Sequence, residues 1–240
     1  MEGYTALISG LFALSGALGG QVLNNILTNN REGKKYEKEV YQELYSPVLL
    51  DIIALYDIRT NFRRSHDIKD HIIEENLVNE IKEKINNNIK HANSAVISAY
   101  QELKRFDYYE DLSGFAEERL KLLLYKTLLS EAYNHLKKEK LLNQSQLSLI
   151  NEYRIKYFLW YMMVDYIKDS VTPVEIMSRF WCISEDVYTD SFYEHLQVRF
   201  EKVERGFFKD VFESEFKGYI LDDCEDMFAD MLEKIDNQIP

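Results

Sequence analysis

The side chains in this sequence that could coordinate a metal are few and poorly spaced for that task. The histidines are His66, His71, His91, His135 and His195. None belongs to an HExxH or ExxH pattern, so the ligand pairs of zincins and di-iron bundles are missing. Glu131 and His135 are four residues apart and could present two ligands on one helical face, but we interpret them as an ordinary surface pair.

An acidic run near the C-terminus is the other candidate for metal binding. It consists of Asp222, Asp223, Glu225, Asp226 and Asp230. The run lacks the glycine and the alternating spacing of an EF-hand loop, and it is typical of a solvated helical face. We therefore predict no metal site.

Covalent catalysis and nucleotide binding have no local signature. The chain contains no GxSxG, GxxxxGK[ST] or GxGxxG pattern. Cys182 and Cys224 form no CxxC pair, which fits buried thiols in a reducing compartment. We expect no cofactor.

One enzymatic pattern remains, in the segment RTNFRRSH, where six residues separate Arg59 from His66. This spacing resembles the Arg-x4-6-His motif of HEPN ribonucleases, all-helical domains in which the two residues act on the RNA phosphate. Thr60 stands where that family usually has Asn, Asp or His. The resemblance implies a ribonuclease as one alternative, and a partly solvated loop pair is the other interpretation.

Composition narrows the fold and the partners. The formal net charge of -12 argues against a nucleic-acid-binding surface and against a domain that lies flat on an anionic leaflet. A hydrophobic content of 46% is enough for a packed core, and the chain has only 3 Pro and 9 Gly. With long stretches of helical periodicity, these values predict an all-α fold, a multi-helix bundle.

The stretch from Tyr4 to Leu27 lies in a segment without charge, since no charged residue occurs between Glu2 and Arg31. It is long enough to cross a bilayer core of ~30 Å as a helix. The acidic N-terminus argues against a signal peptide. The lack of a polar cluster before Asn24 argues against a buried core helix, and the lack of charge on either face argues against an interfacial helix. We predict a transmembrane anchor in residues 1–30.

Small residues gather on one face of this predicted anchor: Ala6, Gly10, Ala13, Gly16, Ala17 and Gly20. Gly16 and Gly20 make a small-xxx-small pair, which predicts helix pairing or self-association. The alternative is the general abundance of Gly and Ala in membrane helices.

Basic residues follow the anchor, at Arg31, Lys34, Lys35 and Lys38. The positive-inside rule then predicts an inner-membrane protein with its C-terminal domain in the cytoplasm.

Beyond the anchor the sequence predicts a bundle over residues 31–170 and further helices, packed on the same bundle, over 171–240. Helices are expected at 34–61, 75–108, 113–140, 143–169, 172–182 and, with breaks at Gly206 and Gly218, 189–240. Pro47 predicts a bend near Tyr45, and TPVE at 172–175 is typical of a capping box. The apolar stretch 157–164 is expected to be the most buried.

The segment KKYEKEVYQELYSPVLLDII, residues 34–53, contains Leu44-Tyr45-Ser46-Pro47 behind a glycine-rich anchor. It resembles a loose group of bacterial and prophage proteins with one N-terminal membrane helix, a charged juxtamembrane helix and an LYxP-type kink. The resemblance covers the first quarter of the chain and implies a phage or mobile-element context.

Three functions follow as hypotheses. The first is a membrane-anchored cytoplasmic module that recognises an unknown protein partner, in defence, superinfection exclusion or control of a membrane machine. The second is a membrane-perturbing effector that assembles through its anchor, and the third is the HEPN-like ribonuclease. The expected partners are membrane lipid at the anchor, another protein and a second copy of the chain, with no nucleic acid.

Overall fold

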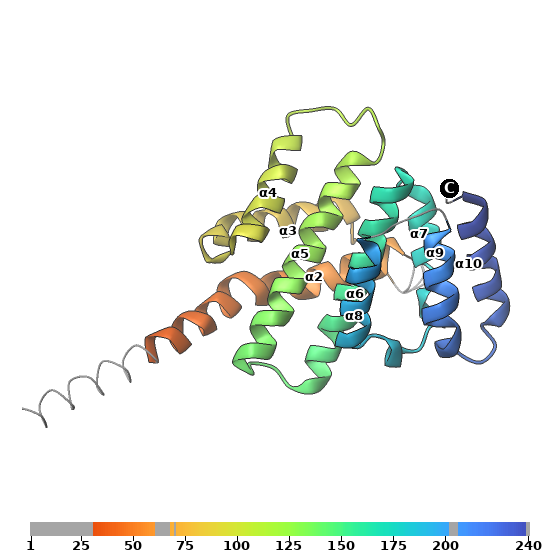
Figure 1. The fold of residues 1–240 in the computed structure, drawn as a ribbon. Coiled ribbons are helices and arrows are strands. Elements are labelled where there is room, and N and C mark those ends of the chain that lie inside the picture. The colour runs from red at the N-terminus through yellow and green to blue at the C-terminus, as the bar shows by residue number, and fades with distance from the viewer. Residues whose placement is uncertain (1–30, 61–67, 70, 202–205, 239–240) are drawn as a thin grey trace, which may run out of the picture. The chain divides into compact units, whose positions relative to one another are not determined.

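The computed structural model describes residues 31–60, 68, 69, 71–201 and 206–238, so the predicted anchor in residues 1–30 lies outside the described part (Figure 1). The described residues are helical, with turns and one isolated antiparallel bridge between Ile183 and Ile220 in place of strands. The all-α prediction is therefore confirmed. Within the described ranges, no helix combines the length and the apolar character needed to cross a membrane.

The chain divides into two compact units between Val40 and Tyr41. The first unit is described from Arg31 onward, and residues 31–40 are helical. Its basic side chains, Arg31, Lys34, Lys35 and Lys38, are all exposed to solvent. The charged group expected next to a membrane is thus available on the surface of this helix.

The second unit begins with a π-helical turn, Tyr41–Tyr45, which leads into α2. The helices that follow are α2 (Ser46–Arg59), α3 (Glu74–Asn88), α4 (Ser94–Phe106), α5 (Ala116–Glu139), α6 (Gln144–Ile167), α7 (Val171–Met177), α8 (Asp190–Phe200), α9 (Phe207–Val211) and α10 (Glu225–Gln238). Short 3-10 helices occur at Ile89–His91, Phe180–Cys182, Glu185–Val187 and Lys217–Tyr219, and a second π-helical turn at Phe212–Phe216. The irregular turn before Pro47 lies where the sequence predicts a bend, because proline lacks the N–H for the helical hydrogen bond.

The centre of this unit is the hairpin of α5 and α6, two helices of 24 residues each joined by a short turn. α2 crosses this hairpin, and Tyr157 on α6 donates a 2.7 Å hydrogen bond to the carbonyl of Ile52. Tyr56 packs edge-on against both Tyr157 and Trp160 at 5.6 and 5.7 Å. The segment 157–164 is largely buried, as its apolar character on all sides predicts.

The prediction of a single helix over 75–108 is wrong, because the structure has two helices, α3 and α4, in this range, and the α-helical conformation is interrupted between them. The asparagines explain the break, since their side chains compete with the backbone for hydrogen bonds. Asn88 donates to the carbonyl of Lys84 at 3.1 Å, and Asn93 accepts from the N–H of Val96 at 3.0 Å as the N-cap of α4.

The predicted start of α7 is also wrong. The helix begins at Val171, and the side chain of its N-cap residue, Ser170, forms no capping hydrogen bond. Asp169 does this instead: its two carboxylate oxygens accept from the N–H groups of Val171 and Thr172 at 3.1 and 2.8 Å. A carboxylate one residue before the cap can do this because the N–H groups of the first helical turn have no partner within the helix.

Candidate functional site

Arg59, the arginine of the ribonuclease-like pattern, lies at the end of α2 and is held by two carboxylates. Its Nε lies 2.8 Å from Glu74, its Nη1 donates to Glu118, and its guanidinium lies 5.1 Å above the ring of Trp160. Burial alone would lower its pKa, but Glu118 and Glu74 outweigh burial and raise the pKa of Arg59. The side chain therefore connects α2, α3, α5 and α6, and it would have to leave both carboxylates to bind a phosphate. His66 lies outside the described residues.

A cavity of about 440 Å³ lies beside Arg59. Its walls include the carboxylates of Asp111, Glu117, Glu118 and Glu175, each of which is engaged in a hydrogen bond or an ion pair. Glu117 pairs with Lys121 at 2.7 Å, and Glu175 pairs with Lys234 at 2.6 Å. The described residues of this cavity present neither an open set of metal ligands nor a nucleophile with an adjacent base.

A second buried charge lies in the middle of α6. The guanidinium of Arg154 is sandwiched between the rings of Tyr133 and Tyr193, at 4.0 and 3.9 Å from their centroids. Its Nη2 donates to Asp190 at 2.9 Å, and the hydroxyl of Tyr133 donates to the same carboxylate at 2.9 Å. Burial lowers the pKa of Arg154, with Tyr193 and Asp190 opposing it. This cluster ties α5, α6 and α8 together.

Lys156 forms a third buried contact of the same kind. Its ammonium donates to Glu152 and lies 5.5, 5.1 and 5.3 Å from the rings of Tyr56, Tyr153 and Tyr188. Aromatic faces stabilise a desolvated cation, so Lys156 fits a structural role in the core.

The other residues considered as metal ligands stay separate. The ring of His135 packs against Tyr45 at 5.4 Å, and the acidic run before and in α10 is exposed. Across the part of the chain that the structure describes, no three His, Cys, Asp or Glu side chains converge on a possible metal position.

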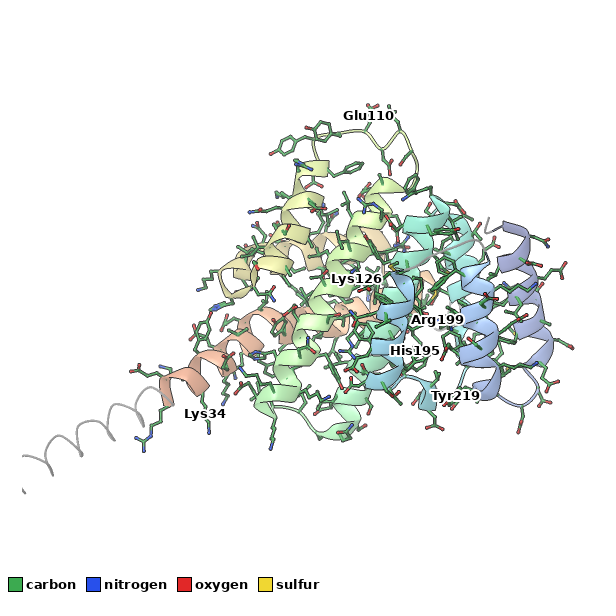
Figure 2. The ribbon with its side chains drawn as sticks, viewed as in Figure 1. Lys34, Glu110, Lys126, His195, Arg199 and Tyr219 are labelled. Atoms are coloured by element: carbon green, nitrogen blue, oxygen red, sulfur yellow. The ribbon has the colours of Figure 1, made fainter. Side chains whose placement is uncertain are left out.

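The most unusual surface feature is the loop from Asp107 to Phe115, between α4 and α5. It carries three large apolar side chains in solvent: Tyr108, Tyr109 and Leu112 are 82%, 66% and 91% exposed. The loop forms one end of the bundle, and Glu110 at its tip lies beyond the ends of both helices (Figure 2). We call residues 107–115 the apolar loop.

The apolar loop has a defined shape because Asp111 organises it. One oxygen of Asp111 accepts from the Ser113 N–H, the Ser113 hydroxyl and the Gly114 N–H, at 3.0, 2.6 and 3.0 Å. The other oxygen accepts from the Glu117 N–H at 2.9 Å. Burial raises the pKa of Asp111, but these hydrogen bonds outweigh it and lower the pKa overall.

Gly114 allows the chain to turn into α5. Its φ of +75° lies in the left-handed region, where a side chain would be strained. Its carbonyl accepts from the hydroxyl of Ser170 at 3.0 Å, which connects the apolar loop to the chain before α7. The apolar loop thus holds three exposed apolar side chains on a backbone that several hydrogen bonds keep in place.

The sequence predicts a loop between the two helices here, but not that the loop exposes large apolar side chains. The sequence predicts Ser113 as the N-cap of the helix, whereas the N-cap residue of α5 is Phe115, two residues later; the hydroxyl of Ser113 still accepts from the Ala116 N–H at 3.0 Å. The signal that was missed is DYYEDL at 107–112, where two tyrosines and a leucine occur in an otherwise polar turn. Comparison with known protein families, with curated proteins and with solved structures gave no match.

Proposed function

We propose that this chain is a non-enzymatic interaction module that binds another protein through the apolar loop. The observation that carries the proposal is the exposure of Tyr108, Tyr109 and Leu112 on a loop that Asp111 holds in one shape. Tyrosine supplies a large contact area at a small cost in conformational entropy, and a loop that is already ordered loses little more on binding.

The charges of the apolar loop favour a protein over a lipid surface as the partner. Asp107, Glu110 and Asp111 flank the three apolar residues along the chain, and Asp107 is paired with Lys82 at 2.7 Å. An anionic leaflet repels such a group, whereas a protein surface with basic residues around an apolar patch attracts it.

The N-terminal segment sets the location in this proposal. Residues 4–27 anchor the chain in the inner membrane, the exposed basic residues at 31–38 face the cytoplasm, and the helical unit recognises its partner there. A phage or mobile-element context would make the partner part of a defence, exclusion or regulatory system at that membrane.

Photocrosslinking in cells tests the binding. A photoreactive amino acid replaces Tyr108 in one variant and Leu50 in a control variant, because Leu50 is 71% exposed on α2 and lies outside the apolar loop. The expected result is a discrete adduct from position 108 and none from position 50. Equal adducts from both positions, or none from position 108, would contradict the proposal.

A variant of the apolar loop tests whether its apolar side chains bind the partner, and its melting temperature shows whether the protein is still folded. Tyr108→Ser, Tyr109→Ser and Leu112→Ser together remove exposed side chains, so the melting temperature should stay unchanged. With the photoreactive residue at position 110 in both backgrounds, the adduct should disappear in the triple variant. An adduct of undiminished yield would show that the apolar side chains are not the binding surface.

A further inference from the structure

A small polar cavity lies between α5 and α8, with Arg154 of α6 in its wall. α8 packs beside the α5–α6 hairpin, and the hydroxyls of Ser130 and Tyr193 lie 2.9 Å apart across the two helices (Figure 1). The cavity has a volume of about 280 Å³, just below the ~300–1,000 Å³ of pockets for drug-sized ligands, so it suits a small molecule. We call it the α5–α8 cavity, and none of residues 107–115 lines it.

The two helices run in opposite directions along this cavity. Tyr133 on α5 donates to Asp190, the first residue of α8, at 2.9 Å. One turn earlier on α5, Ser130 meets Tyr193, which lies one turn further along α8. Asp190 therefore marks one end of the cavity, and the contact between Ser130 and Tyr193 marks the other.

The end at Asp190 is positive. Nη2 of Arg154 donates to Asp190 at 2.9 Å, and the ammonium of Lys137 donates to the same carboxylate. Two cations against one carboxylate leave an excess of one positive charge. The Nε of Arg154 is also buried without a hydrogen-bond acceptor. A buried N–H group without an acceptor costs free energy, and a guanidinium matches a carboxylate in shape, so this end favours a ligand with a carboxylate.

The other end of the cavity carries two carboxylates that have no partner. Glu131 follows Ser130 on α5, Glu194 follows Tyr193 on α8, and both line the cavity. Among the residues that the structure describes, neither carboxylate forms an ion pair or a hydrogen bond. Glu131 is half-buried and Glu194 is exposed, so a ligand can reach both from solvent. One carboxylate from each helix favours a ligand with a positively charged amine.

We infer that the α5–α8 cavity binds a free amino acid, a small zwitterion whose carboxylate pairs with Arg154 and whose ammonium lies between Glu131 and Glu194. A simple amine would leave the guanidinium N–H without an acceptor, and a simple carboxylic acid would leave both glutamates without a counter-charge. Because this site lies apart from the apolar loop, the inference goes beyond the proposed function and does not depend on it.

Calorimetric titration of the full-length protein in detergent tests the inference. The titrants are the common L-amino acids, β-alanine and 4-aminobutyrate, one at a time, and at least one should bind. Analogues of that ligand without one charged group, as ethylamine and propionate are for alanine, should each bind about tenfold more weakly, because each loses a charge-assisted contact. The inference is overturned if no titrant binds, or if either analogue binds as tightly as the amino acid.

Variants of the two free glutamates locate the ligand. Glu131→Gln and Glu194→Gln should each weaken the binding about tenfold, because an amide replaces the carboxylate that faces the ammonium. Both changes keep the contacts of Arg154, so the melting temperature without ligand should stay unchanged. The control is Glu201→Gln, at an exposed residue that ends α8 outside the cavity, and it should bind as the wild type does. An affinity that both cavity variants leave unchanged would place the ligand elsewhere and overturn the inference.

Discussion

Arg154 shows how a single residue can hold this bundle together. Its guanidinium is 4% exposed between two tyrosine rings, and its salt bridge with Asp190 crosses from α6 to α8. The sequence separation of 36 residues between Arg154 and Asp190 explains why the pair could not be predicted. Asn151, Glu152, Arg154 and Lys156 are all buried in the structure because α6 is covered on more than one side.

Arg154→Ala should lower the free energy of unfolding by about 2 kcal/mol, because it removes a buried side chain with two ring contacts and its pairing with the partly exposed Asp190. Arg154→Lys should lose less, since it keeps the charge but not the planar stacking. Urea unfolding measures both. Lys234→Ala, which breaks a surface pair with Glu175, is the control and should cost under ~1 kcal/mol. Equal losses in Arg154→Ala and the control would contradict this role.

Cys182 should be unreactive in the folded protein. Burial, reinforced by the neighbouring Cys224, raises the pKa of its thiol to about 11, and only the thiolate reacts with alkylating agents. At pH 8, iodoacetamide should modify it slowly in buffer and rapidly in urea. Because the folded state favours the protonated thiol, Cys182 also makes the stability of the fold depend on pH. Its contribution to the free energy of unfolding is complete below the unfolded pKa of ~8.5 and is lost as the pH rises toward 11. Rapid labelling in buffer would contradict the burial of Cys182.

At the scale of the elements, the apolar loop depends on one carboxylate. Asp111→Ala removes four hydrogen bonds, three within the apolar loop and one to the first turn of α5, which should cost about 1 kcal/mol, as for the loss of a helix cap. Hydrogen exchange should become faster at residues 107–117 and stay unchanged in α6. Asp111→Asn should retain part of the protection because its amide oxygen can still accept.

The pH dependence of the loop follows from the lowered pKa of Asp111. A carboxylate with a lowered folded pKa stabilises the folded state above its unfolded pKa of ~3.9, and this stabilisation is lost as the pH falls through the folded value. Loop protection should therefore be constant from pH 8 to 5 and decline below 4 in the wild type, but not in Asp111→Ala. A decline of equal size in both proteins would exclude Asp111 as its cause.

Helix positions were predictable to the extent that local signals decide them. Asn143 starts α6 with the capping box that its sequence allows, and Gly206 precedes α9 with φ of +80°. The break between α3 and α4 was missed because the apolar period continues through it, while the asparagines at 86–88 and 93 favour local hydrogen bonds. The cap of α7 by Asp169 was missed because TPVE is the more familiar start signal.

For the whole molecule, composition was sufficient to predict an all-α bundle, since proline and glycine are scarce and the apolar period is that of a helix. The order in which the helices pack could not be derived, because contacts such as Tyr157 with Ile52 join residues far apart in sequence. The anchor and the Arg59–His66 pair both include residues outside the described part, and they remain predictions.

Fractionation tests the anchor. The full-length chain should stay with membranes after a carbonate wash, and protease added from outside should leave the C-terminal helices intact. Deletion of residues 1–27 should release the chain into the soluble fraction. Release of the full-length protein by carbonate would contradict the anchor, and digestion of the helices from outside would contradict its orientation.

The most direct test of the binding role of the apolar loop is the accessibility of its tip. A maleimide reagent can report it with little background, because both native cysteines are buried. Glu110→Cys keeps the three apolar side chains, and Leu50→Cys is the exposed control. If the apolar loop binds another protein, position 110 should react slowly in native membranes and rapidly in dilute purified protein, whereas position 50 should react rapidly in both. Equal reactivity of position 110 in the two preparations would contradict the proposed function.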